Sequence, residues 1–369
     1  MSIWKRTTSL SGQCSTEPFE MWESPDKSRK TFTVHATYGK PIDILSLKLD
    51  VLEDFRAQVE HVKKTRSALF SSPEIEIVQA CPICNAPAEQ SRFSVQIYNA
   101  RYHECLSCTH RFVINRPGQR ALDRFYSEDA PIASTYTDRR TSETRVKQVA
   151  TPKAQWALAE FERVHGTKPE RILDVGAGGG HFVYACHLLG LNADGIELSE
   201  SSRDYCKRHF EIDLRAEDFL SNDLSLPEYD LITFWGVIEH VAEPVQFLNA
   251  ARKHLSQHKG MVIAEVPRWE CLGTAIQSQW NDSLVRHLNP MGHIHIFSDN
   301  SLATAFANAS LAPAAVWYFG MDAYEWATQM SYHLDDPSVV EKIKELIPGV
   351  QQSLDSARFS DEVVLAAIP

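Results

Sequence analysis

The sequence lacks any long apolar run, and its N-terminus lacks the apolar core of a secretory signal. No window holds enough uninterrupted apolar residues to cross a bilayer. The first residues, Met1 to Arg6, include polar and basic side chains where a signal peptide needs apolar ones. We therefore expect a cytoplasmic protein without a membrane partner.

Positive charge is also scarce. The 369 residues include 37 Lys and Arg against 48 Asp and Glu, which gives a formal net charge of −11. Proteins that bind nucleic acid through bulk electrostatics carry clustered, excess Lys and Arg, so this balance disfavours a nucleic-acid partner. The 43% hydrophobic and 23% charged residues are ordinary for globular chains and exclude a mainly disordered or fibrous protein.

Cysteine is infrequent, but half of it is clustered. Four of the eight cysteines are solitary, and four form two C-x2-C pairs separated by 20 residues. In a cytoplasmic chain this spacing is typical of a zinc site, because each pair directs two thiolates at one ion. Four thiolates leave no open position, so we expect structural zinc; four unrelated buried cysteines are the alternative. His103 and His110 flank the second pair, but four cysteines already complete the site. The predicted ligands are Cys81, Cys84, Cys105 and Cys108.

The composition along the chain predicts four segments. An extended or poorly ordered arm over about residues 1–40 precedes an amphipathic helix within 41–70, and Pro73 ends that helix. The ribbon, a small zinc-binding domain, follows. The connector is polar, and the last segment contains a helical insertion at about 321–358. The predicted segments are residues 1–74 (arm and helix), 75–118 (zinc ribbon), 119–150 (connector) and 151–369 (the last domain).

From Thr151 onward, strand-like and helix-like patterns alternate. This alternation predicts an α/β fold with a parallel sheet covered on both faces. Thr151 and Pro152 are expected to open the first helix, and Gly166 to follow its end. The expected strands are 171–175, 193–197, 212–215, 230–234, 261–266, 315–319 and 363–367; the expected helices are 151–165, 181–189, 199–209, 244–255 and 338–346.

The glycine-rich loop after the first of these strands is the main chemical signal. Residues 174–180 read Asp-Val-Gly-Ala-Gly-Gly-Gly, where glycines let the backbone turn and let a ligand approach closely. A tight strand-to-helix turn is the simpler interpretation; a nucleotide-type cofactor site is the functional one. The third glycine of the dinucleotide fingerprint would fall on His181, so the spacing differs from G-x-G-x-x-G. Asp174 suits a cofactor with a positively charged amino-acid tail better than a pyrophosphate.

Two further acidic positions extend this pattern. Glu197 ends the second strand, where a carboxylate commonly binds a ribose diol. Asp218 and Phe219 follow the third strand and offer an acid for an adenine amino group and a ring for packing. The fourth strand continues as Trp235-Gly236-Val237-Ile238-Glu239-His240.

At these residues the sequence resembles the class I S-adenosylmethionine-dependent methyltransferases. The resemblance implies a doubly wound, seven-stranded, Rossmann-like sheet with an antiparallel last strand, and S-adenosylmethionine as cofactor. The preceding ribbon is similar to those of bacterial sugar C-methyltransferases and of rRNA guanine methyltransferases. The chain lacks the extra C-terminal domain expected of the first group and the basic surplus expected of the second. The implied cofactor-binding residues are Asp174, Gly176, Ala177, Gly178, Gly180, Glu197, Leu198, Asp218, Phe219 and Trp235.

His240 is the candidate base, and Glu239 is the candidate residue that orients it. Histidine is the usual proton carrier near neutral pH, and a base is needed when the methyl acceptor must lose a proton. A polar residue that caps the following helix is the alternative interpretation of His240.

The segment after the fifth strand is rich in Trp, His and Asn, and this family places acceptor-binding residues there. Residues 293–297 alternate like a strand, so His293 and His295 are expected on one face. A second metal site and hydrogen-bonded structural histidines are the alternatives to a substrate-facing role. The candidate substrate residues are Trp269, His287, His293 and His295.

The sequence thus predicts a methyltransferase that acts on a small polar metabolite, a sugar or nucleotide-linked sugar. One alternative is an RNA base methyltransferase that grips RNA with the ribbon. The other is a non-catalytic zinc-containing interaction protein, against which the intact glycine loop and Glu197 argue. The oligomeric state and the acceptor atom are left open.

Overall fold

A computed structural model of the chain describes residues 3–6, 18–25, 27–40, 55–118, 120–121, 142–280, 287–336 and 338–369. Across these ranges, no helix combines the length and the apolar character that a bilayer crossing requires.

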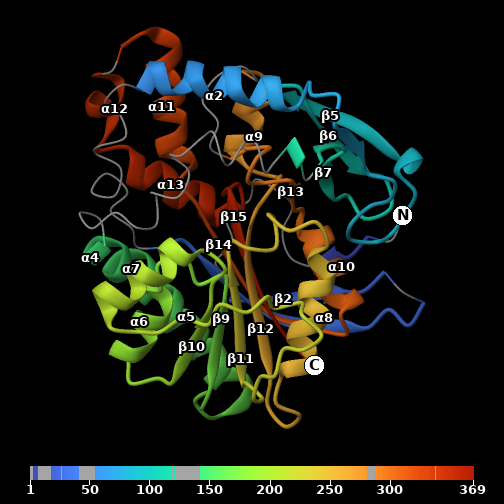
Figure 1. Ribbon diagram of the computed structural model, residues 1–369, viewed down its shortest axis with the longest axis vertical. Helices are drawn as coiled ribbons and strands as arrows, with labels where there is room; N and C mark the ends of the chain where they lie inside the picture. The colour runs from blue at the N-terminus through green and yellow to red at the C-terminus, as the bar shows by residue number, and fades with distance from the viewer. Residues whose placement is uncertain are drawn as a thin grey trace.

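The centre of the molecule is a nine-stranded sheet, counted over the described residues, in the order β1-β2-β3-β14-β15-β12-β11-β9-β10 (Figure 1). Its strands are β1 (Lys5–Arg6), β2 (Phe19–Glu23), β3 (Thr31–Tyr38), β9 (Ile172–Val175), β10 (Ala193–Ile196), β11 (Leu231–Trp235), β12 (Met261–Pro267), β14 (Ala312–Phe319) and β15 (Glu362–Ile368). The strands β10, β9, β11 and β12 are parallel, and β15 runs antiparallel to both β12 and β14. The predicted α/β fold with an antiparallel last strand is confirmed.

The strand expected at 212–215 is reduced to a single bridge between Ile196 and Arg215. Only Arg215 pairs: its N–H bonds to the Gly195 carbonyl at 2.8 Å, and its carbonyl accepts from the Glu197 N–H at 2.9 Å. This bridge lies at the edge of the sheet next to β10. It takes the place of the third of the seven expected strands, counted in chain order.

The N-terminal residues extend this sheet instead of forming a separate arm. The strand β3 lies parallel to β14, and β2 pairs antiparallel with β3. Within β2, Glu20 and Trp22 are buried, and the Trp22 indole N–H donates to Glu20 at 2.8 Å. Glu20 also accepts from Tyr38 at 3.0 Å and pairs with Arg358, which is far away in the chain. One face of β2 is therefore buried although it carries a carboxylate, because the charged partner of Glu20 comes from the other end of the chain.

Two apolar clusters fill the two faces of the sheet. Alternate residues of each strand point to opposite faces, so Leu173 and Leu365 belong to one cluster and Ile172 and Val364 to the other. The covering helices are α8 (Pro244–His254) and α10 (Asp299–Asn308) on the first face, and α5 (Thr151–His165) and α6 (His181–Leu188) on the second, as Figure 1 shows. The helix α7 (Glu200–Phe210) lies beside α6 and begins at the Ser199 cap.

The first helix of the catalytic domain has the expected bounds, but helical residues precede it. The helix α4 (Ser142–Arg145) and a π turn (Val146–Ala150) run directly into α5 (Thr151–His165), so Thr151 begins α5 without capping a free helix end. The Thr151 N–H bonds to the Val146 carbonyl, as a wider turn requires, and Pro152 has no N–H to lose. The expected stop at Gly166 is confirmed, with φ 72°.

The cysteine ribbon contributes a second, four-stranded sheet in the order β13-β7-β6-β5. Its strands are β5 (Ser91–Ile97), β6 (Ala100–Cys105), β7 (Arg111–Val113) and β13 (His295–Ile296), and a separate pair joins β4 (Ile75–Ile77) with β8 (Asn115–Pro117); a short 3-10 turn spans Ala88–Gln90. The strand β13 comes from the segment after β12, so the catalytic part completes the ribbon sheet. Cys81 and Phe112 also belong to the same apolar cluster as the α8 face of the central sheet.

The remaining helices lie at the end of the sheet where the glycine loop opens (Figure 1). They are α2 (Phe55–Leu69), α9 (Leu272–Gln277), α11 (Asp322–Leu334), α12 (Ser338–Ile343) and α13 (Ile347–Ser356). The last three lie between β14 and β15, within the expected insertion. The helix expected within 41–70 is described only from residue 55, and much of the connector lies outside the described residues.

Candidate active site and metal centre

The glycine loop after β9 is held in a shape that needs glycine. Gly176, Gly178 and Gly180 have φ values of 74°, 53° and 77°, in the left-handed region. A Cβ on Gly176 would lie 2.7 Å from Val237, and one on Gly180 would lie 2.1 Å from the Cys206 sulfur. The loop is therefore packed tightly against the segment that follows β11 and against α7.

A cavity of about 440 Å³ opens beside this loop. Its volume is in the range of small-molecule and cofactor sites, and it lies at the carboxyl ends of the parallel strands. Helix α5, the glycine loop, the end of β10 and the segment after β11 form its wall. The predicted cofactor residues on this wall are Asp174, Gly176, Ala177, Gly178, Glu197 and Trp235.

Asp174 lies at the base of the cavity and is only 2% exposed. Burial raises the pKa of Asp174 to about 7. The hydrogen bond that its carboxylate accepts from the Thr233 hydroxyl at 2.8 Å acts in the opposite direction, because it favours the charged form. A cation bound beside this carboxyl would restore its negative charge. The position therefore suits the ammonium group of an amino-acid tail.

Glu197 is fixed by two backbone amides on opposite sides of its carboxylate. One oxygen accepts from Gly178 N at 2.7 Å, and the other accepts from Ser199 N at 2.7 Å. These bonds orient the carboxylate at the cavity wall with lone pairs left for a ligand, because each oxygen can accept more than one hydrogen bond. This is the geometry that recognition of a ribose diol requires.

Lys153 and Arg145 also line the cavity, and no motif in the sequence marks either residue. The Lys153 ammonium donates to Glu265 at 2.8 Å and lies 5.0 Å above the Trp235 ring. A lysine within a helix usually indicates a solvent-exposed face. The apolar neighbours Ala154 and Ala157 are local signs that this turn of α5 packs inward, where Lys153 is 9% exposed.

Four predicted cofactor residues do not lie on the cavity wall. Gly180 closes the turn against α7, and Leu198 is 65% exposed. Phe219 is a core residue that packs against Phe234 at a centroid distance of 5.8 Å. Asp218 is exposed and accepts a hydrogen bond from a nearby backbone N–H. Their cofactor roles stay predictions that the cavity does not support directly.

His240 lines the same cavity as Asp174 and Glu197. Its Nδ1 lies 2.7 Å from the Gly292 carbonyl and therefore carries the hydrogen, which leaves the lone pair of the neutral ring on Nε2. The helix α8 has Glu243 at its cap position, so His240 does not cap that helix.

Glu239 lies beside His240 and is buried, with one carboxylate oxygen 3.4 Å from His240 Nε2. Its second oxygen has no hydrogen-bond partner among the described residues. Burial raises the pKa of Glu239, and the neighbouring His240 lowers it. A buried carboxylate beside an imidazole can stabilise the imidazolium ion, which suits general base chemistry.

The histidines after β12 separate into two groups, so the expectation that His293 and His295 share one face is wrong. The short strand β13 contains only His295 of the two. His293 has its ring centroid 5.3 Å from that of His240, and the ligand atoms of Glu239, His240 and His293 lie within 4.8 Å of one another. Such a group can share a proton or hold a metal ion. His295 instead points to His110 of the ribbon, at 2.9 Å.

The other two substrate candidates lie farther from Glu239 and His240 in the hydrogen-bond network. His287 is buried, with Nε2 3.5 Å from the Cys271 sulfur, and its carbonyl lies 2.7 Å from His293 Nδ1. The ring of Trp269 lies 4.8 Å from the guanidinium of Arg111, a ribbon residue. His287 thus supports His293, and Trp269 contacts the ribbon.

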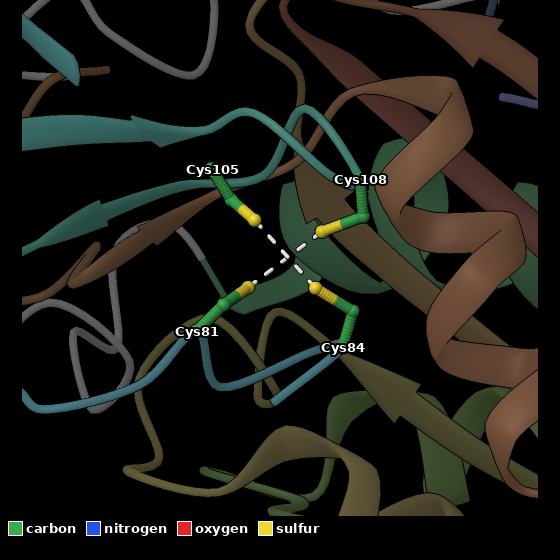
Figure 2. A group of neighbouring side chains, drawn as sticks. All are labelled: Cys81, Cys84, Cys105 and Cys108. Carbon is green, nitrogen blue, oxygen red and sulfur yellow. Dashed lines mark hydrogen bonds between the residues drawn. The ribbon is translucent and has the colours of Figure 1, made fainter. Parts of the chain in front are cut away.

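The four paired cysteines converge on one point (Figure 2). All four sulfurs lie within 4.8 Å of one another, with Cys81 to Cys108 at 3.6 Å and Cys84 to Cys105 at 3.5 Å. A tetrahedron with zinc–sulfur bonds of about 2.3 Å has edges of about 3.8 Å, so the cluster fits a structural zinc ion.

The two turns that carry these cysteines have the same backbone design. In the first, the Asn85 N–H bonds to the Cys81 carbonyl at 2.9 Å; in the second, the Thr109 N–H bonds to the Cys105 carbonyl at 2.9 Å. Asn85 and Thr109 each have a positive φ, 58° and 61°. Repeating this turn lets each pair direct both thiolates at a single ion.

Comparison with known proteins agrees with this geometry. Residues 147–316 match the family model described as "Methyltransferase domain". These residues are a methyltransferase domain of the class I, S-adenosylmethionine-dependent type.

Two similar curated proteins are both named ubiquinone biosynthesis O-methyltransferase. The one from Actinobacillus pleuropneumoniae is 30% identical over 101 residues, which are 25% of this chain and 43% of that protein. The one from Bartonella tribocorum is 32% identical over 114 residues, which are 29% of this chain and 45% of that protein. The chain thus spans less than half the length of these curated relatives.

Solved methyltransferase structures are more distant. The plantazolicin methyltransferase has a TM-score of 0.43 and 15% identity, over 66% of this chain and 91% of that one. Magnesium protoporphyrin IX methyltransferase from Synechocystis has a TM-score of 0.40 and 12% identity, over 68% and 94%.

Proposed function

We propose that this protein transfers a methyl group from S-adenosylmethionine to a hydroxyl group of a small polar metabolite, a sugar or nucleotide-linked sugar. One observation carries the proposal: Asp174, Glu197 and His240 line a single cavity. Cofactor recognition and a candidate base therefore meet at one place, as direct transfer between two bound molecules requires.

Charged residues of the cavity would bind different groups of the cofactor. Glu197 would bind the ribose diol, and Asp174 would bind the ammonium group of the amino-acid tail. Lys153 and Arg145 supply positive charge on the same wall, where the carboxylate of that tail needs a partner. When bound, S-adenosylmethionine supplies a methyl group on a sulfonium, which is already a good leaving group.

The contribution of the protein to the transfer is then alignment, exclusion of water and removal of one proton. His240 Nε2 would accept the hydroxyl proton, while the bond from Nδ1 to Gly292 holds the ring in the tautomer that this needs. Glu239 would stabilise the imidazolium that forms, because its carboxylate lies 3.4 Å away.

Two observations support a small hydroxylated acceptor. The two relatives quoted above are named O-methyltransferases. The net charge of −11 opposes a polyanionic acceptor that would be held by bulk electrostatics. The cysteine cluster fits structural zinc, which Cys81, Cys84, Cys105 and Cys108 would hold and which would stabilise the ribbon without taking part in the transfer.

The decisive experiment is a donor-consumption assay on purified protein with S-adenosylmethionine. Nucleotide sugars, free sugars, phenols and RNA are supplied separately, each with and without added Mg²⁺ and with a chelator that leaves the cysteine site loaded. We expect turnover with a sugar or nucleotide sugar. Turnover with RNA alone would replace the proposal by the RNA alternative, and turnover with phenols alone would replace the acceptor class. Strict dependence on Mg²⁺ would indicate that Glu239, His240 and His293 bind a metal ion instead of accepting a proton.

A further inference from the structure

A chain of buried hydrogen bonds joins the ribbon to the loop that carries the catalytic pair. His110 Nε2 lies 2.9 Å from His295 Nδ1, and His295 Nε2 lies 3.0 Å from the carbonyl of Val241. Both histidines are completely buried. Val241 follows His240 directly and lines the cofactor cavity.

The direction of this chain is fixed by its last acceptor. A carbonyl cannot donate, so His295 Nε2 must carry the hydrogen and His295 Nδ1 must accept from His110 Nε2–H. The other ring nitrogen of His110 then carries the lone pair. The Ser301 hydroxyl lies 3.4 Å from it but donates to the Ser298 carbonyl at 3.1 Å. Arg116 approaches His295 Nε2 at 3.5 Å but cannot donate to a nitrogen that already carries hydrogen. The bonds therefore run in one direction, from His110 through His295 to the loop after β11.

His295 holds this loop at two points. Its ring donates to the carbonyl of Val241, and its backbone N–H donates to the carbonyl of Glu239 at 3.2 Å. The two carbonyls belong to the residues on either side of His240. The position of the His240 backbone is therefore set by one residue of β13.

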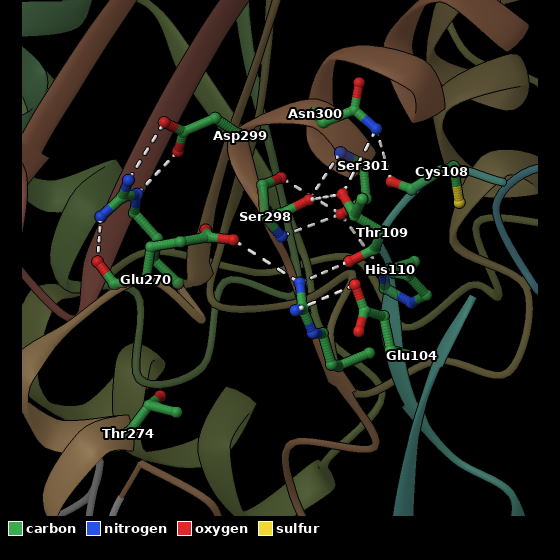
Figure 3. A network of polar contacts seen from close by, with 12 residues as sticks. Glu104, Cys108, Thr109, His110, Glu270, Thr274, Ser298, Asp299, Asn300 and Ser301 are labelled. Carbon is green, nitrogen blue, oxygen red and sulfur yellow. Dashed lines mark hydrogen bonds and ion pairs between the residues drawn. The ribbon is translucent and has the colours of Figure 1, made fainter. Parts of the chain in front are cut away.

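The other end of this series of hydrogen bonds lies at the second cysteine turn, as Figure 3 shows. The Asn300 side chain donates to the carbonyl of Cys108 at 2.6 Å, and the hydroxyls of Thr109 and Ser298 lie 2.7 Å apart. His110 directly follows Thr109 in the sequence. Because β13 also pairs with β7, the ribbon reaches His295 through both backbone and side-chain contacts.

We infer that His110 and His295 are positioning residues: through their hydrogen bonds, the folded cysteine ribbon keeps the loop from Glu239 to Val241 in place. The ribbon is then a structural part of the methyl-transfer site and not an independent binding module. The predicted effect on turnover rests on the proposed function; the predicted effect on loop order does not. An apolar ring in place of His295 would fill the same space and leave the Val241 carbonyl and His110 without their partner.

The test compares His295→Phe, His295→Gln and His110→Phe with a matched control, His103→Gln. His103 is a partly buried ribbon histidine whose ring lies 3.1 Å from the Ser91 hydroxyl, away from the loop. Three quantities are measured on the full, zinc-loaded chain: the turnover number, the cofactor Kd, and amide hydrogen exchange over residues 237–242.

For His295→Phe we expect turnover to fall by about 10- to 100-fold, the range seen when a residue that orients a site ligand is lost. The cofactor Kd should stay within about threefold, because Asp174 and Glu197 do not depend on this contact, and exchange over 237–242 should rise. His295→Gln should recover part of both losses, because its amide can donate to the Val241 carbonyl. His110→Phe should show the same pattern more weakly, and His103→Gln should match the native protein.

Unchanged turnover together with unchanged exchange over 237–242 in His295→Phe would overturn the inference. An equal loss in His103→Gln would also overturn it, since the effect would then be general to the ribbon. If His295→Phe does not fold, the comparison of His295→Gln with His295→Asn decides, because Asn is too short to reach the Val241 carbonyl. If no acceptor is ever methylated but exchange rises as expected, the proposed function fails and the loop contact stands.

Discussion

The two halves of the site are built in different ways. The cofactor half, from Asp174 to Gly180 with Glu197, consists of residues close in the chain, and its key bonds join Gly178 and Ser199 to Glu197. The acceptor half combines Glu239 and His240 with His293, and the ribbon reaches this half through His295. Short motifs can encode the first half, whereas only long-range pairing can assemble the second.

This difference predicts unequal sensitivity. A cofactor half made of local turns should survive damage elsewhere in the fold, because its contacts are formed within two consecutive strand-turn-helix units. An acceptor half that depends on ribbon packing should be lost when the ribbon is lost. The four predictions below test this contrast, in order of decreasing expected effect.

The largest effect is expected from Cys108→Ser. Structural zinc contributes about 10–16 kcal/mol to the folding of small zinc domains, so loss of one thiolate should release the metal and unfold residues 75–115 first. Elemental analysis should fall from one zinc per chain to none, and turnover should be abolished while weakened cofactor binding persists.

Cys206→Ala is the matched control for this experiment, because Cys206 is a buried thiol outside the cluster. It should keep one zinc per chain. Loss of cofactor binding in Cys108→Ser to the same extent as turnover would contradict the separation of the two halves. Absence of zinc from freshly prepared, unchelated native protein would remove the metal from the ribbon altogether.

The next effect concerns His240→Ala. A positioned base typically contributes about 10²–10⁴-fold in rate, so turnover should fall by that factor with nearly unchanged cofactor affinity. Glu239→Gln should lose less, because it keeps the shape of the side chain and removes only its charge. Full turnover of His240→Ala on the true acceptor would move the base to His293, the histidine nearest to the pair.

A smaller effect is expected in the cofactor half from Glu197→Ala. Loss of hydrogen bonds to a charged group costs about 1.5–3 kcal/mol, which corresponds to a roughly 10- to 150-fold lower affinity for the cofactor. Calorimetry with S-adenosylmethionine or its demethylated product measures this loss. Glu200→Ala, an exposed acidic residue in the first turn of α7, is the control and should bind normally. Equal affinities in the two variants would remove Glu197 from the site.

The smallest effect is a pH dependence that originates at Asp174. The folded-state pKa of about 7 lies above the ordinary value of 3.8, so the contribution of Asp174 to stability is fully present below pH 4 and lost as the pH rises to 7. The ammonium group of the cofactor prefers the ionised carboxyl. Affinity should therefore rise from pH 6 to about 7.5 by less than tenfold per unit, then fall as the cofactor amine, with a pKa of about 7.7–8.0, loses its proton.

Asp174→Asn should bind more weakly and lose the rise between pH 6 and 7.5. Binding titrations at several pH values on both proteins make this comparison. A rise of the same steepness in the variant would assign the titration to another group of the cavity.

Features with a local cause could be predicted from the amino-acid sequence alone. The run from Asp174 to Gly180 must turn with positive φ, and the two cysteine pairs must form matched turns, because these constraints act within a few residues. The alternation of strands and helices likewise predicted the doubly wound sheet, since periodicity reports which face is buried.

The way in which distant segments share the site could not be predicted and depends on long-range packing. Glu20 is buried on one face of β2 because Arg358 pairs with it, and Lys153 faces the cavity because Glu265 pairs with it. The alternation of residues 293–297 predicted one face for two histidines, but β13 ends against the ribbon, so His295 turns to His110. The physical reason is that a buried polar group goes where its hydrogen-bond partner lies, and the sequence does not show which distant residue that will be.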